Sequence, residues 1–294
     1  MRLATRIEGI DSLDVFAQFV QKVVYRAIPQ ESIRKDLLSG TWLGRPLHPL
    51  LTDVVIGAWL SSLLLDVLSD EQSEKAADQL LFVGNVAAFP TVASGLSDWA
   101  ELWGEQQRLG SIHALGNAAA LALQIMSSMN RKNGKRKTAT ILSVSAFSIA
   151  AVSAYLGGHL SFVKGVGVNQ TAFEPWPQEW TPVIAEEDLV DSTLMQSKAN
   201  DVDVLLYKEG EEIYALSDRC SHRGCPLHLG QVDDLMVECP CHGSIFRLSD
   251  GAVIRGPATV PAPSYEVRRR AGKVEVRLLV RAQWGREARH EKRR

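Results

Sequence analysis

The chain carries two cysteine and histidine motifs, Cys220-Ser-His222-Arg-Gly-Cys225-Pro-Leu and Cys239-Pro-Cys241-His242-Gly-Ser244. The first motif spaces cysteine and histidine as C-x-H, and the second as C-x-x-H. Two thiolates and two imidazoles on separate loops suit a cluster in which sulfur binds one iron and nitrogen binds the other. A single tetrahedral zinc accepts the same residue types, but zinc motifs usually space paired cysteines as C-x(2-4)-C rather than alternating cysteine and histidine. We therefore expect a two-iron, two-sulfur cluster, with zinc as the alternative.

The other two cysteines, Cys225 and Cys241, follow the proposed thiolate ligands within each motif. Closing the two loops around a cluster would bring them together, so a disulfide between them is geometrically plausible. All four cysteines of the chain belong to these motifs. Because a disulfide that braces a buried cluster can persist in a reducing environment, the cysteines do not indicate a cellular compartment.

The motif pair resembles the Rieske iron-sulfur proteins, especially the C-T-H-x-G-C and C-P-C-H-G-S loops of the cytochrome bc complexes. The resemblance implies one iron bound by two cysteines, one bound by two histidines, and a disulfide beside them: Cys220 with Cys239, His222 with His242, and Cys225 with Cys241. It also implies a small all-β domain. Such a cluster transfers single electrons, and its histidine ligands allow reduction to be coupled to proton uptake.

Three residues match positions that surround the cluster in this family. Ser244 matches a serine that hydrogen-bonds a bridging sulfide, and Pro257 lies in a Gly-Pro-Ala loop that shields the cluster. Phe246 stands where high-potential members have a tyrosine. Loss of that hydroxyl donor removes stabilisation of the reduced cluster, so we expect a potential below that of the bc-complex proteins.

Composition divides the chain into different parts. It has 294 residues, 32 basic and 34 acidic, and a net charge of −2, which gives no reason to expect binding to nucleic acid. Charges are scarce between Leu47 and Val163 and abundant after Glu174. We expect separate α and β domains, with a transmembrane bundle first and an all-β domain last.

Residues 1–39 form an amphipathic region before the apolar part of the chain. Leu13, Phe16, Val20, Val23 and Ala27 fall on one helical face. This helix either lies on a membrane surface or packs against the next domain.

Residues 40–163 contain four apolar runs. The first ends at Leu68, and the others cover Ala76–Ser97, Ile112–Met129 and Thr138–Val163. Each approaches the length that a helix needs to cross a bilayer, so we expect four transmembrane helices. A buried soluble bundle is the alternative. This region resembles a four-span bacterial membrane domain of unassigned function that often precedes a Rieske domain, through Gly-Thr-Trp-Leu-Gly-x-Pro-Leu-His-Pro at 40–49, Gly-Leu-Ser-Asp-Trp at 95–99 and Tyr-Leu-Gly-Gly-His-Leu at 155–160.

Five ionisable side chains in these spans form a candidate haem or quinone site: His48, Asp53, Asp98, His113 and His159. The antiparallel order of the spans places the three histidines and Asp98 toward one side of the membrane. Two imidazoles could bind a b-type haem, or a histidine with a carboxylate could accept protons from a quinol. The alternative is that each histidine only hydrogen-bonds a neighbouring helix.

The rest of the chain reads as a linker at 164–182, the Rieske-like domain at 183–280 and a basic tail at 281–294. Short alternating runs separated by Glu-Gly, Asp-Gly and Ala-Gly turns favour β structure after the linker.

We expect a membrane-anchored electron-transfer protein that acts between the bilayer and a redox partner protein, rather than a stand-alone oxidoreductase. A ferredoxin-like redox subunit or sensor with a simple anchor is the alternative. The sequence does not indicate an oligomeric state.

The positive charges on the two sides of the spans nearly balance, so they do not decide the membrane orientation. The loop at 131–137 and Lys75 favour one side as cytoplasmic, whereas Arg34, Lys35 and Arg45 with Arg108 and Lys164 favour the other. No twin-arginine signal is visible. We therefore expect the cluster domain on the cytoplasmic side.

Overall fold

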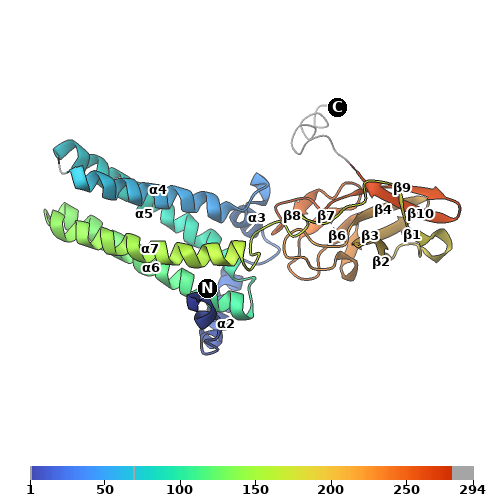
Figure 1. Ribbon diagram of the computed structural model, residues 1–294, viewed down its shortest axis with the longest axis horizontal. Coiled ribbons are helices and arrows are strands. Elements are labelled where there is room, and N and C mark those ends of the chain that lie inside the picture. Colours follow the sequence, from blue (N-terminus) through green and yellow to red (C-terminus); the bar gives the residue numbers. More distant parts are fainter. Residues whose placement is uncertain (1, 69, 280–294) are drawn as a thin grey trace. The chain divides into compact units, whose positions relative to one another are not determined.

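The computed structural model describes residues 2–68 and 70–279, so the expected basic tail at 281–294 lies outside the described residues. The chain forms two compact units (Figure 1). One contains the residues up to Asn169 together with Arg255–Val260, and is helical. The other contains Gln170–Ile254 and the residues from Pro261 on, and is built from β-strands. Separate helical and β domains are the fold class that the sequence predicted.

Four long helices make up most of the helical unit: α4 (Leu47–Leu68), α5 (Glu71–Trp99), α6 (Gly104–Lys132) and α7 (Arg136–Phe162). By length and composition, all four can cross a membrane. Asp70 caps α5, because its carboxylate accepts hydrogen bonds from the backbone nitrogens of Gln72 and Ser73, each at 3.0 Å.

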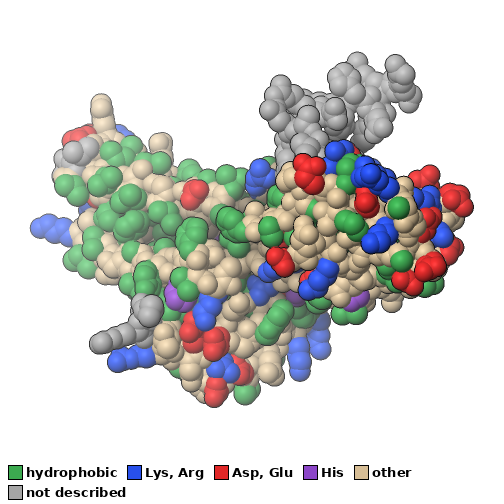
Figure 2. All heavy atoms as spheres, turned by 45° about the vertical axis from the view of Figure 1, so that its right-hand side comes forward, with side chains coloured by type: hydrophobic (Ala, Val, Ile, Leu, Met, Phe, Trp, Pro, Cys, Tyr) green, Lys and Arg blue, Asp and Glu red, His purple; other side chains and the backbone are tan. Residues whose placement is uncertain are grey.

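The outer surfaces of these helices are apolar. On α5, for example, Phe82 and Phe89 are 67% and 63% exposed. Figure 2 shows hydrophobic side chains over the long helices, and charged side chains gathered over the β unit. A water-soluble protein rarely exposes such a continuous apolar surface. The surface matches a lipid environment, and the helical unit is a membrane domain.

The four spans form two similar helical hairpins. Within the first, Ser62 of α4 donates a hydrogen bond to the carbonyl of Ala77 on α5, at 2.7 Å. Within the second, Ser127 of α6 donates to the carbonyl of Ala139 on α7, at 2.8 Å. Both serines are 2% exposed or less, and both alanines are fully buried. The α4–α5 and α6–α7 hairpins therefore share this serine-to-alanine contact.

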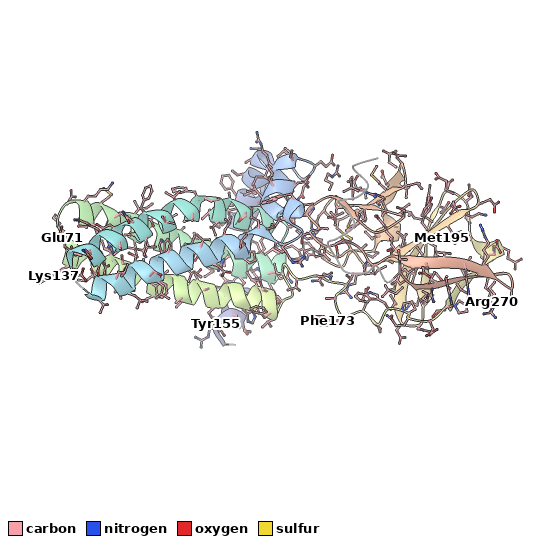
Figure 3. All side chains as sticks on the ribbon, turned by 90° about the horizontal axis from the view of Figure 1, so that it is seen from above. Glu71, Lys137, Tyr155, Phe173, Met195 and Arg270 are labelled. Atoms are coloured by element: carbon pink, nitrogen blue, oxygen red, sulfur yellow. A yellow bond between two sulfur atoms is a disulfide. The ribbon has the colours of Figure 1, made fainter. Side chains whose placement is uncertain are left out.

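An ion-pair cluster closes the end of the bundle at which α4 and α6 end. Arg131 of α6 binds Asp66 of α4 at 2.5 Å and Asp78 of α5 at 2.8 Å. Arg136 of α7 binds the same two carboxylates, at 2.5 and 2.6 Å. In Figure 3, the labelled Glu71 and Lys137 mark this end. All four spans are joined there by charge.

Three short helices precede the spans: α1 (Arg2–Glu8), α2 (Leu13–Ala27) and α3 (Ile33–Ser39), followed by a 3-10 turn, η1 (Thr41–Leu43). Ala17 and Val24 of α2 pack in a core with Trp99 and Ala100 at the end of α5. Phe19 on the opposite side of α2 is 67% exposed. The helix thus packs against the bundle through one face and presents a second apolar face outward.

Over residues 170–279, the β unit forms ten strands in three sheets: β1 (Thr181–Ala185), β2 (Leu194–Ala199), β3 (Val202–Glu209), β4 (Glu212–Ser217), β5 (Gln231–Asp233), β6 (Met236–Glu238), β7 (Ile245–Arg247), β8 (Val253–Arg255), β9 (Tyr265–Arg270) and β10 (Lys273–Leu278). The sheets have the orders β1-β10-β9, β2-β3-β4 and β5-β6-β7-β8. Two 3-10 turns, η2 (Glu186–Asp188) and η3 (Leu227–Leu229), lie between strands. Buried Val204, Leu206, Val274 and Val276 form the core between the first two sheets.

The second half of the predicted linker belongs to the β unit. The backbone nitrogen of Gln170 donates to the carbonyl of Ser221 at 3.0 Å, and Trp176 packs against the core. Glu174 accepts hydrogen bonds from the Ser217 hydroxyl at 2.8 Å and from the Trp176 indole at 3.2 Å. These contacts fix the chain ahead of β1.

Candidate metal centre

Two loops of similar backbone shape carry the cysteines and histidines. The first follows β4, and the second connects β6 to β7. In the first, the nitrogen of Gly224 donates to the carbonyl of Cys220 at 2.8 Å, and in the second Gly243 donates to Cys239 at 3.0 Å. Both glycines have positive φ, at 74° and 72°, which a residue with a side chain rarely adopts. Each motif therefore needs its glycine to turn the chain around the ligands.

The two proposed thiolate ligands lie together in the interior. Cys220 is 1% exposed and Cys239 is 2% exposed. Their thiols form a hydrogen bond, which raises the pKa of Cys220 and lowers the pKa of Cys239 to about 7. The two sulfurs therefore lie close enough to each other to bind one iron together.

The two proposed nitrogen ligands also form a pair. The ring centroids of His222 and His242 are 5.2 Å apart, with the ring planes at 89°. His242 is 9% exposed. Each loop thus contributes one sulfur to the thiol pair and one imidazole to the second pair, as an iron pair with different ligands requires.

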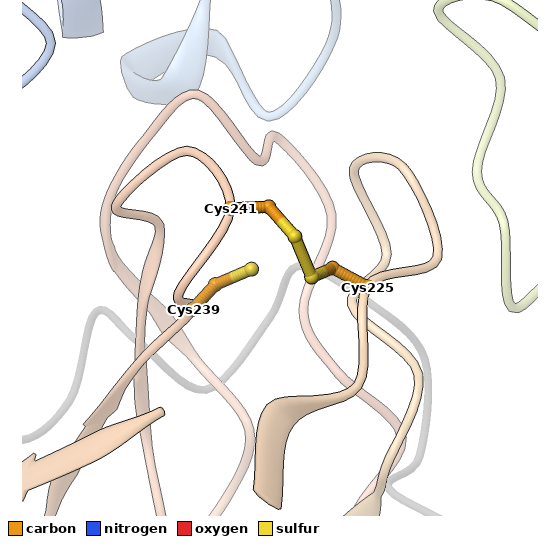
Figure 4. A group of neighbouring side chains, drawn as sticks. All are labelled: Cys225, Cys239 and Cys241. Carbon is orange, nitrogen blue, oxygen red and sulfur yellow. A yellow bond between two sulfur atoms is a disulfide. The ribbon is translucent and has the colours of Figure 1, made fainter. Parts of the chain in front are cut away.

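The remaining cysteines form a disulfide. Cys225 and Cys241 are bonded, with their Cα atoms 6.4 Å apart, so the bridge joins the two loops. Figure 4 shows the sulfur of Cys239 directed toward this bridge. The sulfurs of these three cysteines lie within 4.8 Å of one another. Since disulfide sulfurs are poor metal ligands, the bridge braces the site and leaves Cys220 and Cys239 to bind metal.

The expected neighbours of the cluster are found in different settings. Ser244 and Phe246 are fully buried at the start of β7, and the Ser244 carbonyl accepts a hydrogen bond from the nitrogen of Cys239 at 2.8 Å. Pro257 follows Gly256 through a cis peptide bond, in the Arg255–Val260 segment that groups with the helical unit. A shielding role for Pro257 stays a prediction.

Asp218 and His228 form a brace that sequence reasoning missed. The Asp218 carboxylate, 2% exposed, lies 2.6 Å from Nδ1 of His228 and accepts a hydrogen bond from the His228 nitrogen at 2.7 Å. The two residues flank the first motif in sequence. Spacing alone does not reveal their contact, because it depends on the turn between them.

The donor set fits an iron-sulfur cluster. Two buried thiols, two paired imidazoles and a bridging disulfide converge from two loops. Residues 179–266 match the family described as "Rieske [2Fe-2S] domain". Over 100 residues, the chain is 32% identical to Ferredoxin CarAc of Metapseudomonas resinovorans, covering 34% of this chain and 94% of that protein.

The chain is a Rieske [2Fe-2S] protein. Residues 44–170 of this Rieske protein match a second family, described as "Predicted membrane protein (DUF2231)". The Rieske part is also 38% identical over 76 residues to the 3-phenylpropionate/cinnamic acid dioxygenase ferredoxin subunit of Escherichia coli, covering 26% of this chain and 72% of that one. It is 37% identical over 79 residues to the cytochrome b6-f complex iron-sulfur subunit of Chlorobaculum tepidum, covering 27% of this chain and 42% of that one.

The five candidate residues in the membrane domain of the Rieske protein do not form one group. His48 and His113 lie together, with ring centroids 6.5 Å apart. His159 faces Glu8 of α1 instead, at 3.5 Å. Asp98 is partly buried near the charges of Lys35 and Glu101, and Asp53 is exposed. The structure therefore brings together only the two histidines of α4 and α6.

Lys35 and Glu101 are buried charges that the sequence reading did not single out as a pair. The Lys35 ammonium lies 2.5 Å from the Glu101 carboxylate, and both side chains are 2% exposed. It also donates to the carbonyl and the hydroxyl of Ser97, at 2.9 and 3.0 Å. These bonds tie α3 to the end of α5, which is a structural role.

Proposed function

We propose that this Rieske protein carries single electrons between a carrier in the membrane, a quinol or a haem, and a soluble redox partner protein. The observation that carries this proposal is the union in one chain of a cluster ligand set and four membrane spans. When bound, the cluster supplies a one-electron redox centre. Cys220, Cys239, His222 and His242 would hold it, and the two imidazoles would face the partner.

Relatives of two kinds support this proposal. One is named as the iron-sulfur subunit of a cytochrome b6-f complex. Two others are named as a ferredoxin and as a ferredoxin subunit of a dioxygenase. A protein with both features suits exchange between bilayer and solution.

The test uses full-length protein purified in detergent, with its cluster intact by electron paramagnetic resonance. We expect a ubiquinol or menaquinol analogue to reduce the cluster, and a soluble electron acceptor to reoxidise it. The matched control is His242→Cys, which removes one imidazole but keeps a ligand. If only a soluble reductase reduces the wild-type cluster, the alternative holds: a ferredoxin-like subunit or sensor whose membrane domain is an anchor.

We propose that the Rieske domain lies on the cytoplasmic side. At the bundle end where α4 and α6 begin, Arg26, Arg34 and Arg45 are exposed cations. At the other end, Arg131 and Arg136 are engaged by Asp66 and Asp78, while Lys75, Lys132, Lys135 and Lys137 are exposed. Cationic loops favour the cytoplasm, but the exposed charges at the two ends nearly balance, so the side is tested directly. A reporter fused after Arg294 should be active there, whereas activity only on the outside would reverse the assignment.

A further inference from the structure

Two imidazoles lie close together inside the membrane domain, with their rings nearly perpendicular. The ring centroids of His48 and His113 are 6.5 Å apart and their planes stand at 81°. His48 lies as far along α4 from Ser62 as His113 lies along α6 from Ser127, the serines that mark the repeated hairpins. The pair therefore occupies equivalent positions on the two hairpins, one ring from each.

Hydrogen bonds fix the same tautomer in both rings. Nδ1 of His48 lies 3.0 Å from the carbonyl oxygen of Thr91, and Nδ1 of His113 lies 2.7 Å from that of Ser153. A carbonyl oxygen only accepts, so each Nδ1 carries the hydrogen and each Nε2 carries a lone pair. A neutral imidazole held in this way by a carbonyl is the usual form of a histidine that binds a metal through Nε2.

The surroundings of each Nε2 agree with that tautomer. The side-chain amide nitrogen of Asn117 donates to Nε2 of His113 at 3.1 Å, so that nitrogen is an acceptor, and a metal bound there would take the place of this amide. The hydrogen bonds of His48 to described residues go through Nδ1, to Thr91 and to the Ser94 hydroxyl. Its Nε2 lone pair is therefore available to a ligand.

A glycine makes room for each ring. A Cβ atom at Gly95 of α5 would lie 2.6 Å from Cε1 of His48, and one at Gly157 of α7 would lie 2.9 Å from Cε1 of His113. Both distances are too short for a side chain. Gly95 follows Thr91 by one helical turn, as Gly157 follows Ser153, so the two hairpins repeat the glycine together with the carbonyl.

The chemistry of the pair selects its ligand. A bare zinc or copper ion needs about four protein ligands, but the side chains that contact these rings are amides and hydroxyls. A porphyrin supplies four in-plane nitrogens to its iron, so two axial imidazoles complete it. With about 2 Å from metal to nitrogen, two rings on opposite sides of one iron have centroids roughly 6.3 Å apart. The observed 6.5 Å fits this arrangement.

We propose that His48 and His113 are the axial ligands of a b-type haem held between α4 and α6. The proposal rests on the proposed function, because it identifies the membrane carrier that would exchange electrons with the cluster. Haem also explains why the repeat keeps a histidine, a carbonyl acceptor and a glycine in both hairpins, since the ligand contacts both in the same way.

The test uses full-length protein, expressed with added 5-aminolevulinate and iron and purified in detergent. We expect about one haem per chain by the pyridine haemochrome assay and a low-spin ferric signal in electron paramagnetic resonance. His48→Leu and His113→Leu should each lose the haem or convert it to a high-spin form, while the cluster signal remains. The matched control is His159→Leu, a third histidine of the same unit, which should keep the haem.

A substitution that preserves ligation guards against simple misfolding. His113→Met should retain the haem and raise its reduction potential, because a methionine axial ligand favours the reduced iron. A merely structural histidine would show no such shift. Wild-type protein with a full cluster but no haem after reconstitution with hemin, or low-spin haem that survives both leucine variants, would overturn the proposal.

The two proposals fail separately. Quinol reduction of the cluster in wild-type protein that binds no haem would overturn the haem site and keep the proposed function. Stable bis-histidine haem in protein whose cluster responds only to a soluble reductase would support the haem site and overturn exchange with the membrane.

Discussion

Phe246 stands where the resemblance to high-potential Rieske proteins implies a tyrosine. Its side chain is fully buried on β7, directly after the second cluster loop. Restoring a hydroxyl in Phe246→Tyr should stabilise the reduced cluster by one hydrogen bond, about 1 kcal/mol. For one electron this corresponds to a rise of roughly 40 mV in reduction potential. Protein-film voltammetry measures it.

The control for this substitution is Phe246→Leu, which changes the packing without adding a donor. We expect its potential to stay near that of the wild-type protein. A fall or no change in the tyrosine variant, with the cluster intact, would show that the hydroxyl does not reach a sulfur of the cluster.

Residue types and spacing indicated a two-iron cluster, and the resemblance to Rieske loops implied the ligand pairs and the disulfide. C-x-H and C-x-x-H spacings on two loops restrict the pairing, because each loop supplies one sulfur and one nitrogen. Contacts such as Asp218 with His228 are not encoded by spacing. They arise only when the loop folds back, so the sequence offers no local signal for them.

At the scale of elements, the ion pairs at one end of the bundle should contribute strongly to its stability. The side chains of Arg131 and Asp66 are 2% and 1% exposed. Removing Arg131 takes away the most buried cation of the cluster and leaves the buried Asp66 paired with Arg136 alone. Arg131→Met should therefore lower the free energy of unfolding by about 3 kcal/mol. Far-ultraviolet circular dichroism during unfolding in detergent measures this change.

Arg136→Met is the matched control, because Arg136 binds the same carboxylates but is 24% exposed. It should cost clearly less than Arg131→Met. The double variant Asp66→Asn with Arg131→Gln should recover part of the loss, since no charge is then buried alone. Equal losses in both single arginine variants would contradict this account.

The segment ahead of β1 leads to a pH-dependent prediction. Burial raises the pKa of Glu174, against the lowering effect of its hydrogen bonds from Ser217 and Trp176. A raised folded-state pKa contributes stability below the unfolded pKa of about 4.3, and this contribution is lost as pH rises through the folded pKa. At pH 7, Glu174→Gln should therefore make the β unit more stable than wild type, and the advantage should vanish below about pH 4.

Thermal unfolding at pH 7 and pH 4 checks this expectation, with Glu179→Gln at an exposed neighbouring position as the control. If the Glu174→Gln variant were less stable than wild type at both pH values, the charged carboxylate would be needed for folding.

The sequence could not predict this packing. Prolines and polar residues at 164–182 indicate a linker, whereas Trp176 reveals its role only through the core that it contacts.

The repeat of the two hairpins was also hidden from pattern reading. Equivalent positions hold different residues, such as Asp66 opposite Arg131 and Thr91 opposite Ser153, so identity between the halves is low. The equivalence is carried by backbone carbonyls and small residues. Hydropathy showed four spans, but it does not show which side chains occupy equivalent positions in the two hairpins.

At the scale of the whole molecule, each unit has its own core. The helical unit packs around Leu81, Ala120 and Ala146, and the β unit around Val204 and Val274. Units with separate cores need not unfold together. We therefore expect two transitions on heating in detergent, one in the visible absorbance of the cluster and one in the helical circular dichroism.

Variants in each unit should move only one of these transitions. The double variant Cys225→Ala and Cys241→Ala lacks the disulfide, which bridges a separation of 16 residues. Its loss should lower the free energy of unfolding of the β unit by about 3 kcal/mol. It should lower the midpoint of the cluster transition and leave the helical one in place, while Arg131→Met should do the reverse. If either variant shifted both midpoints equally, the two units would unfold as one cooperative body. The membrane domain would then stabilise the cluster domain directly. A substitution in one unit lowers the stability of the other only if the stabilities of the two units are coupled.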